Sequence, residues 1–271
     1  MATSRYVLGS KPDEVARLDA QATLYADATE LLLRRGGIGP GMRVLDLGTG
    51  PGHVAQLVAE LVGPHGEVVG IDGDEALLRV AEERRAEAGL EDVRFIQADV
   101  REFVDERPFD AVVGRLILFH LPDAVDVLRR CATLLRPDGL VVAIDFDAGA
   151  GRTDPPVPLV EAAFDYVRSS FRRARANPTI GTRLALLLRE AGLADVASVG
   201  VQSYFAPGDP RGPALLGGVV RTLAARSPDE VPAELALDGL EERIAAALTA
   251  EDAVLLPPTL VGAWGHRERA P

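Results

Sequence analysis

Short apolar runs alternate with amphipathic stretches through the first 150 residues. The amphipathic stretches have apolar positions at helical spacing, and they cover residues 53–62, 74–88 and 122–135. The apolar runs are bounded by glycine, proline or polar residues, as expected for strands buried on both faces, and they cover residues 44–47, 66–71, 93–96, 109–113 and 139–144. Repeated strand–helix units predict a parallel sheet with helices on both faces.

The flanking regions have a different pattern. Residues 13–35 show helical spacing up to Gly36-Gly37, and they predict one N-terminal helix. Residues 149–158 are rich in glycine, proline and aspartate, so we expect a loop there. Further along, the pattern predicts helices at 159–175 and 181–191, a strand at 197–205, two helices within 214–249 and a last strand at 260–264.

Together these elements predict an α/β fold. We expect a doubly wound, mostly parallel seven-stranded sheet with helices on both faces, an N-terminal helical segment and helical cap insertions. The predicted division is a helical cover at 1–40, a cofactor-binding core at 41–150, and the remainder of the sheet at 151–271 with substrate-covering insertions at 156–178 and 208–250.

Charge and cysteine content restrict the partners. The chain has 29 basic and 41 acidic residues and a net charge of −12, which disfavours nucleic acid and anionic membrane surfaces as partners.

The chain has one cysteine, Cys131, which cannot form a disulfide within the chain, and this fits a reducing cytoplasm. No N-terminal run is typical of a signal peptide, and no stretch approaches the ~20 apolar residues of a membrane span. We therefore expect a cytoplasmic protein.

A glycine turn, Asp46-Leu-Gly-Thr-Gly-Pro-Gly52, joins the first strand to the helix that follows. Glycines let a ligand approach the backbone, and ligands bind at this edge of open α/β sheets. A nicotinamide dinucleotide fingerprint would need a third glycine where His53 stands. Asp46 would also repel a pyrophosphate, whereas it suits a cationic ligand with an amino group. The spacing disfavours a dinucleotide and favours a cationic adenosyl cofactor.

Two more acids follow the next strands. Asp72 ends the second strand, where a carboxylate can accept both ribose hydroxyls of either kind of cofactor. Asp99 follows the third strand and can accept an adenine amino group while the N–H of Val100 meets a ring nitrogen. Asp99 can equally cap the segment that follows it.

With these motifs in order, the chain resembles a class I, Rossmann-like, S-adenosylmethionine-dependent methyltransferase. The glycine turn, Val69-Gly-Ile-Asp72, Gln97-Ala-Asp99, residues 109–113 and Leu135-Arg-Pro-Asp-Gly139 match that family's signatures. The N-terminal segment, from Tyr6, resembles a subgroup that acts on small molecules, many of them bacterial secondary metabolites or quinone-like compounds. The resemblance implies these cofactor contacts: Tyr6, Gln21, Asp46, Gly48, Gly50, Gly52, Asp72, Gly73, Asp99, Val100 and Arg115.

The segment after the fourth strand should lie beside the transferred methyl. His120 is a candidate general base or part of the pocket wall, and Arg115 is expected to bind a carboxylate. Asp145 ends the fifth strand and is a second candidate catalytic group. No metal site is expected, since a clear third ligand is lacking. No Asn-Pro-Pro-aromatic motif follows the fourth strand, which disfavours methylation of nucleobase or glutamine amino groups.

The acceptor pocket is expected under the two insertions. Its predicted lining is aromatic, although each ring alone also fits an ordinary core: Phe119, Tyr166, Phe171 and Phe205. The predicted function is S-adenosylmethionine-dependent methylation of a small organic molecule in bacterial secondary metabolism. The alternative is an S-adenosylmethionine-binding enzyme that catalyses a cyclisation or rearrangement without methyl transfer. The sequence leaves open the acceptor, the need for a base, and whether the protein is a homodimer.

Overall fold

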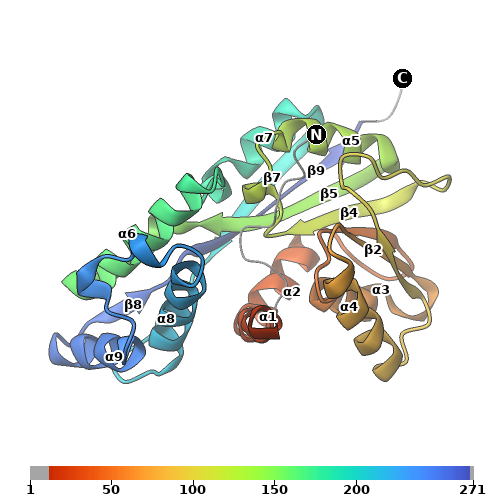
Figure 1. Cartoon of the computed structure of the whole chain (residues 1–271). Coiled ribbons are helices and arrows are strands. Elements are labelled where there is room, and N and C mark those ends of the chain that lie inside the picture. The colour runs from red at the N-terminus through yellow and green to blue at the C-terminus, as the bar shows by residue number, and fades with distance from the viewer. Residues whose placement is uncertain (1–11, 269–271) are drawn as a thin grey trace.

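A twisted sheet of seven strands forms the centre of the computed structural model, which describes residues 12–268 (Figure 1). The strand order is β3-β2-β1-β4-β5-β9-β7. Strands β1 to β5 are parallel, and β9 runs antiparallel to both β5 and β7. The bounds are β1 Arg43–Leu47, β2 Glu67–Asp72, β3 Val93–Gln97, β4 Phe109–Arg115, β5 Leu135–Asp147, β7 Leu193–Val201 and β9 Thr259–Arg267. Strand order reverses between β1 and β4, which is where ligands bind in such sheets.

Helices pack on both faces of this sheet. Helices α5 and α7 bury apolar side chains on one face, and α2 and α3 on the other. Helix α4 packs against the edge strand β3. The bounds are α1 Pro12–Leu24, α2 Ala26–Arg35, α3 His53–Val62, α4 Glu75–Glu87, α5 Ala124–Leu134 and α7 Leu184–Glu190. This arrangement confirms the predicted fold class.

A smaller helical cap lies at one end of the sheet, at the left of Figure 1. It contains α6 Pro158–Arg173, α8 Arg211–Ala224 and α9 Leu240–Ala250. A two-stranded sheet of β6 Arg152–Asp154 and β8 Val254–Leu256 completes it. These elements share a core of their own, in which Phe164, Leu235 and Ile244 are buried. We use "cap" below for residues 152–173 and 205–256.

Three local expectations need correction. The N-terminal helix expected at 13–35 is two helices, because Tyr25 leaves helical geometry (φ −105°, ψ 11°) and its ring packs edge-on against Phe146 with centroids 5.1 Å apart. The loop expected at 149–158 contains β6, which pairs with a segment about 100 residues later. The strand expected at 197–205 occupies 193–201.

Helix α4 begins at a side-chain cap. The carboxylate of Asp74 caps α4 by accepting the N–H groups of Ala76 (2.8 Å) and Leu77 (3.3 Å). Within residues 12–268, no helix has the length and apolarity required to cross a membrane.

Candidate functional site

The glycine turn follows β1 in a conformation that side chains resist. Gly48, Gly50 and Gly52 all have positive φ (62°, 53° and 85°). A Cβ on Gly48 would lie 2.8 Å from the Ile117 side chain, whereas a Cβ on Gly50 would meet open space. Gly50 therefore leaves room for a ligand against the backbone. Gly52 starts α3 and is packed against Ala81 and Phe95 instead.

Asp46 lies behind this turn and not in the cavity wall. Its carboxylate is 1% exposed and accepts the Thr49 hydroxyl at 2.6 Å. Burial raises its pKa to about 7, although that hydrogen bond and the charge of Arg115 oppose the shift. The Asp46 carboxylate thus braces the turn from inside, and its contact with a ligand stays a prediction. Gly52 also lies outside the described lining of the cavity.

Asp72, at the end of β2, holds the turn from the cavity side. Its two carboxylate oxygens accept the N–H groups of Gly50 (2.8 Å) and Asp74 (2.9 Å). Burial raises the pKa of Asp72, and these N–H groups oppose the shift. Each carboxylate oxygen has a second lone pair, so Asp72 can still accept ligand hydroxyls.

Asp99 lies at the neighbouring strand end and is exposed. It accepts the N–H of Arg101 at 2.8 Å, as the capping alternative predicts, and it also lines the cavity. Gly73 and Val100 line the same region, and a Cβ on Gly73 would meet nothing within 4 Å. The ends of β1, β2 and β3 thus form one acidic, glycine-bordered surface, which we call the strand-end chamber.

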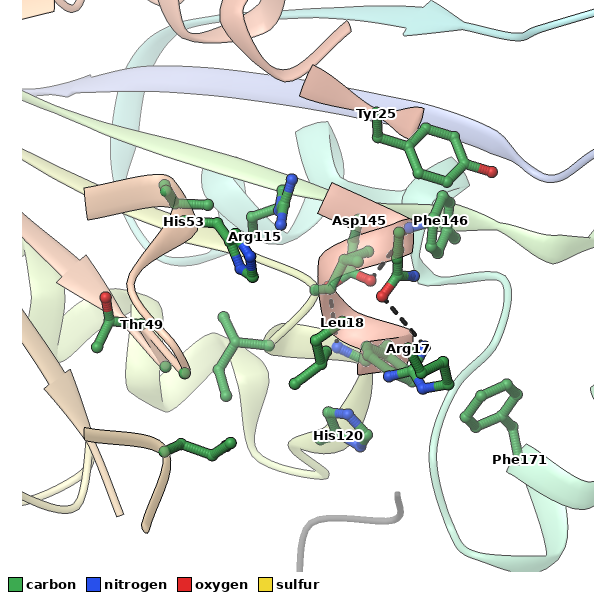
Figure 2. Close-up of a pocket in the computed structure, with 18 of the residues that line it drawn as sticks. Arg17, Leu18, Tyr25, Thr49, His53, Arg115, His120, Asp145, Phe146 and Phe171 are labelled. Carbon is green, nitrogen blue, oxygen red and sulfur yellow. Dashed lines mark hydrogen bonds between the residues drawn. The ribbon is translucent and has the colours of Figure 1, made fainter. Parts of the chain in front are cut away.

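Arg115, at the end of β4, lines the same cavity, and Figure 2 shows it next to His53. Its guanidinium donates to the Thr29 hydroxyl of α2 at 3.1 Å. Burial lowers the pKa of Arg115, and the charge of Asp46 opposes that shift. The side chain remains cationic, so it can bind a carboxylate here.

Asp145 is buried at the end of β5 and organises the segment after β4. Its carboxylate accepts the N–H groups of Phe119 and Phe146, each at 3.1 Å. Burial raises its pKa to about 7, and the backbone hydrogen bonds oppose the shift. Asp145 thereby fixes the turn that presents Phe119 and His120.

His120 lines the cavity close to this turn and is 9% exposed. Burial lowers its pKa to about 3, and the positive charges of Arg17 and Arg226 add to the shift. The imidazole is neutral at physiological pH and holds a proton weakly. Its ring lies against that of Phe119, with centroids 3.7 Å apart.

Helix α1 closes the cavity from the N-terminal side (Figure 2). Arg17, Leu18 and Gln21 line it, and the Arg17 guanidinium donates to the Gln21 side chain at 3.2 Å. On the outer face of α1, Asp19 accepts from Arg84 of α4 at 2.8 Å and lies 2.8 Å from His53. This cluster ties α1 to the first turn of α3, next to the glycines.

The cavity has a volume of about 690 Å³ and continues from the strand ends to the cap. The part beneath the cap, which we call the cap chamber, has a mainly apolar wall. Its described lining comprises Phe119, His120, Leu121, Phe146, Ala148, Phe164, Val167, Phe171, Pro178, Gly212, Leu215, Leu216, Val219, Leu255, Pro257 and Pro258, with Arg17 and Asp145 as the charged groups.

Not every predicted pocket residue reaches this space. Phe119 and Phe171 line it, with ring centroids 5.4 Å apart. Tyr166 and Phe205 pack in the cap core and are absent from the described lining, so their role in the pocket stays a prediction. Tyr6 lies outside the described residues.

Val167 and Arg17 also line the cavity, and neither was predicted individually. Val167 belongs to the same helical stripe as Phe164 and Phe171, and the fold shows that this stripe faces the cavity. Arg17 and Gln21 stand four residues apart in the sequence, which is the spacing of one helix face. That spacing predicts that the Arg17 and Gln21 side chains lie next to each other. Within residues 12–268, no group of three His, Cys, Asp or Glu side chains is placed to hold a metal ion.

The part of the chain that contains most of this site matches a known protein family. Residues 38–186 match a family described as "Methyltransferase domain". The chain belongs to that family. The match begins before β1 and ends within α7, so it includes the glycine turn, Asp72 and the segment around His120.

Curated relatives are similar over part of their length. A ubiquinone/menaquinone biosynthesis C-methyltransferase of Ectopseudomonas mendocina is 32% identical over 137 residues, which are 50% of this chain and 51% of that protein. A ubiquinone biosynthesis O-methyltransferase of Maricaulis maris is 33% identical over 165 residues, 59% of this chain and 62% of that protein. The chain thus spans about half to three fifths of the length of these relatives.

Solved structures share the fold. Phosphoethanolamine N-methyltransferase 2 of Haemonchus contortus, in complex with phosphomonomethylethanolamine and S-adenosylhomocysteine, superposes with a TM-score of 0.62 at 18% identity. The match covers 100% of this chain and 61% of that one. A putative methyltransferase of Bacillus halodurans gives a TM-score of 0.58 at 19% identity, covering 89% of this chain and 99% of that one. At this identity, the likeness establishes the fold.

Proposed function

We propose that this protein transfers a methyl group from S-adenosylmethionine to a small organic molecule. The observation that carries the proposal is the two-part cavity. Its strand-end chamber has the glycine turn and the carboxylates of Asp72 and Asp99, and its cap chamber is apolar. A donor site and an acceptor site joined in one enclosed space are what group transfer between two small molecules requires.

The strand-end chamber fits an adenosyl cation. Asp72, Asp74, Glu75 and Asp99 line it, which suits hydroxyl and amino groups and disfavours a pyrophosphate. Asp72 is positioned for the ribose, and Arg115 for the cofactor's carboxylate. S-adenosylmethionine supplies an electrophilic methyl group on a sulfonium sulfur.

The chain's own residues contribute enclosure and alignment. Helix α1 and the cap form walls of the cavity, and Asp145 fixes the turn that carries Phe119 and His120. With a pKa of about 3, His120 is a weak proton acceptor and serves as a wall of the pocket. Catalysis then depends mainly on holding the two reactants in line.

The relatives support a small organic acceptor, since those compared above are named as C- and O-methyltransferases of quinone biosynthesis. A role in bacterial secondary metabolism, a cytoplasmic location and a homodimer remain predictions from the sequence. The second candidate, a cyclisation or rearrangement in the same cavity without methyl transfer, is distinguished by its products.

Calorimetry with S-adenosylmethionine, S-adenosylhomocysteine and NAD tests the donor site. We expect both adenosyl compounds to bind and NAD not to bind; tight NAD binding alone would contradict the proposal. Mass spectrometry for S-adenosylhomocysteine after incubation with candidate acceptors tests transfer. Conversion of an acceptor without formation of S-adenosylhomocysteine would favour the cyclisation or rearrangement.

A further inference from the structure

Two helices of the cap present apolar stripes to the cap chamber. Phe164, Val167 and Phe171 of α6 are spaced by three and four residues, so they share one helix face. On α8, Leu215 and Val219 form the matching stripe. Aromatic rings on several walls favour a flat apolar guest, because rings pack well edge-on or offset against one another.

The chamber has little negative charge to offer. Of its described lining residues, the only acid is Asp145, which is 1% exposed and has both oxygens engaged by backbone N–H groups. A cationic amine would lose its hydration against these walls without an exposed carboxylate to replace it. The chamber therefore disfavours cationic guests.

Positive charge is present instead. Arg17 brings a guanidinium to the cavity from α1, and Figure 2 shows Arg17, His120 and Phe171 around the same space. Burial lowers the pKa of His120, and the positive charges of Arg17 and Arg226 act in the same direction. A neutral imidazole with so weak a hold on protons is also a poor base for a hydroxyl acceptor.

Resting on the methyl transfer proposed above, we infer that the cap chamber binds an apolar ring bearing an acidic hydroxyl, a phenol or enol, as its anion. Its oxygen faces Arg17, and its ring lies between the stripes of α6 and α8. Binding the acceptor already ionised removes the need for a protein base. Amines of the same size and shape are excluded by their charge.

The probe is 4-nitrophenol, whose yellow anion and colourless acid interconvert near neutral pH and differ in absorbance. The protein is saturated with S-adenosylhomocysteine, and the bound dye is titrated with acid and base. We expect the bound pKa to fall by about one unit relative to the free dye, a roughly tenfold preference for the anion. Calorimetry should show that 4-nitrobenzylamine, the cationic analogue, binds at least about tenfold more weakly than the dye anion.

Three variants test the origin of the shift in the dye's pKa. Arg17→Gln should move the bound pKa back toward that of the free dye. Arg189→Gln removes an exposed arginine of α7 on the sheet and should leave the shift unchanged. Val219→Asp places a carboxylate in the wall and should raise the bound pKa above the wild-type value. S-adenosylhomocysteine affinity, measured for each variant, verifies that the donor site has folded.

An unshifted or raised dye pKa in wild-type protein would overturn the inference, as would tighter binding of the amine or no dye binding at millimolar concentration. Failure of the wild-type protein to bind S-adenosylhomocysteine would instead overturn the proposed function. The dye titration is also run without S-adenosylhomocysteine, so failure of the dye site is distinguished from failure of the donor site.

Discussion

Replacement of Asp72 by alanine is the most direct test of the donor site. The carboxylate accepts N–H groups from Gly50 and Asp74 and lines the cavity beside the glycine turn. If it also accepts two ribose hydroxyls, Asp72→Ala removes two hydrogen bonds to a charged group, each worth about 1.5–3 kcal/mol. At the lower end, the loss is about 3 kcal/mol, which raises the Kd for S-adenosylhomocysteine roughly 100-fold.

The variant should still fold. The two N–H groups that lose their acceptor face a cavity that admits water, so we expect a destabilisation of about 1 kcal/mol. Asp110→Ala is the matched control, because it removes the carboxylate that accepts the Arg43 N–H at 2.6 Å, outside the described lining of the cavity, and should also cost about 1 kcal/mol. Calorimetry gives both affinities, and urea unfolding gives both stabilities.

The comparison separates binding from stability. Asp110→Ala should change the Kd by less than about fivefold, about 1 kcal/mol. A Kd within about threefold of wild type for Asp72→Ala would refute the ribose assignment. Equal weakening in both variants would mean that general loosening of the sheet, and not the Asp72 carboxylate, controls affinity.

Three further predictions concern other parts of the site. Arg43→Leu breaks the ion pairs of Arg43 with Glu67 and Asp105, both at 3.0 Å, at the end of β1 away from the glycine turn. Urea unfolding should show that the free energy of unfolding falls by about 3 kcal/mol, while the affinity for S-adenosylhomocysteine stays unchanged. Burial raises the pKa of Asp145 from 3.8 to about 7, so the folded state binds a proton more tightly than the unfolded state and stability falls as pH rises between those values. Asp145→Asn should flatten this fall in thermal melts recorded across that pH range. An unchanged slope would contradict the raised pKa of Asp145. His120→Gln should retain the wild-type pH–rate profile between pH 6 and 8, and loss of a titration limb would restore His120 as the base.

The glycine turn and the strand-end acids could be predicted because their signals are local. Strand, turn and helix follow one another within a few residues, so the positions of Gly50 and Asp72 at the sheet edge follow from the order of elements. Asp46 shows the limit. Its place in a buried strand was evident, but the direction of its carboxylate depends on the Thr49 hydroxyl and on how the turn folds over it.

The acceptor side could be predicted only in outline. Periodicity indicated that α6 is amphipathic, but the helix buries residues both against the cavity and within the cap core. Phe164 and Phe171 line the cavity and Tyr166 does not, although all three are aromatic. The short strands β6 and β8 pair across about 100 residues, and three-residue strands leave no periodic signal to find.

The separate core of the cap has a consequence for how specificity can change. Phe164 of the cap core, like Val167 beside it, also borders the cavity, whereas the glycine turn and Asp72 belong to the sheet. Substitutions on α6 or α8 can therefore reshape one chamber while the other keeps its geometry. Such a division makes the cap an exchangeable module: one donor-binding sheet can serve a series of acceptors, each with its own arrangement of helices.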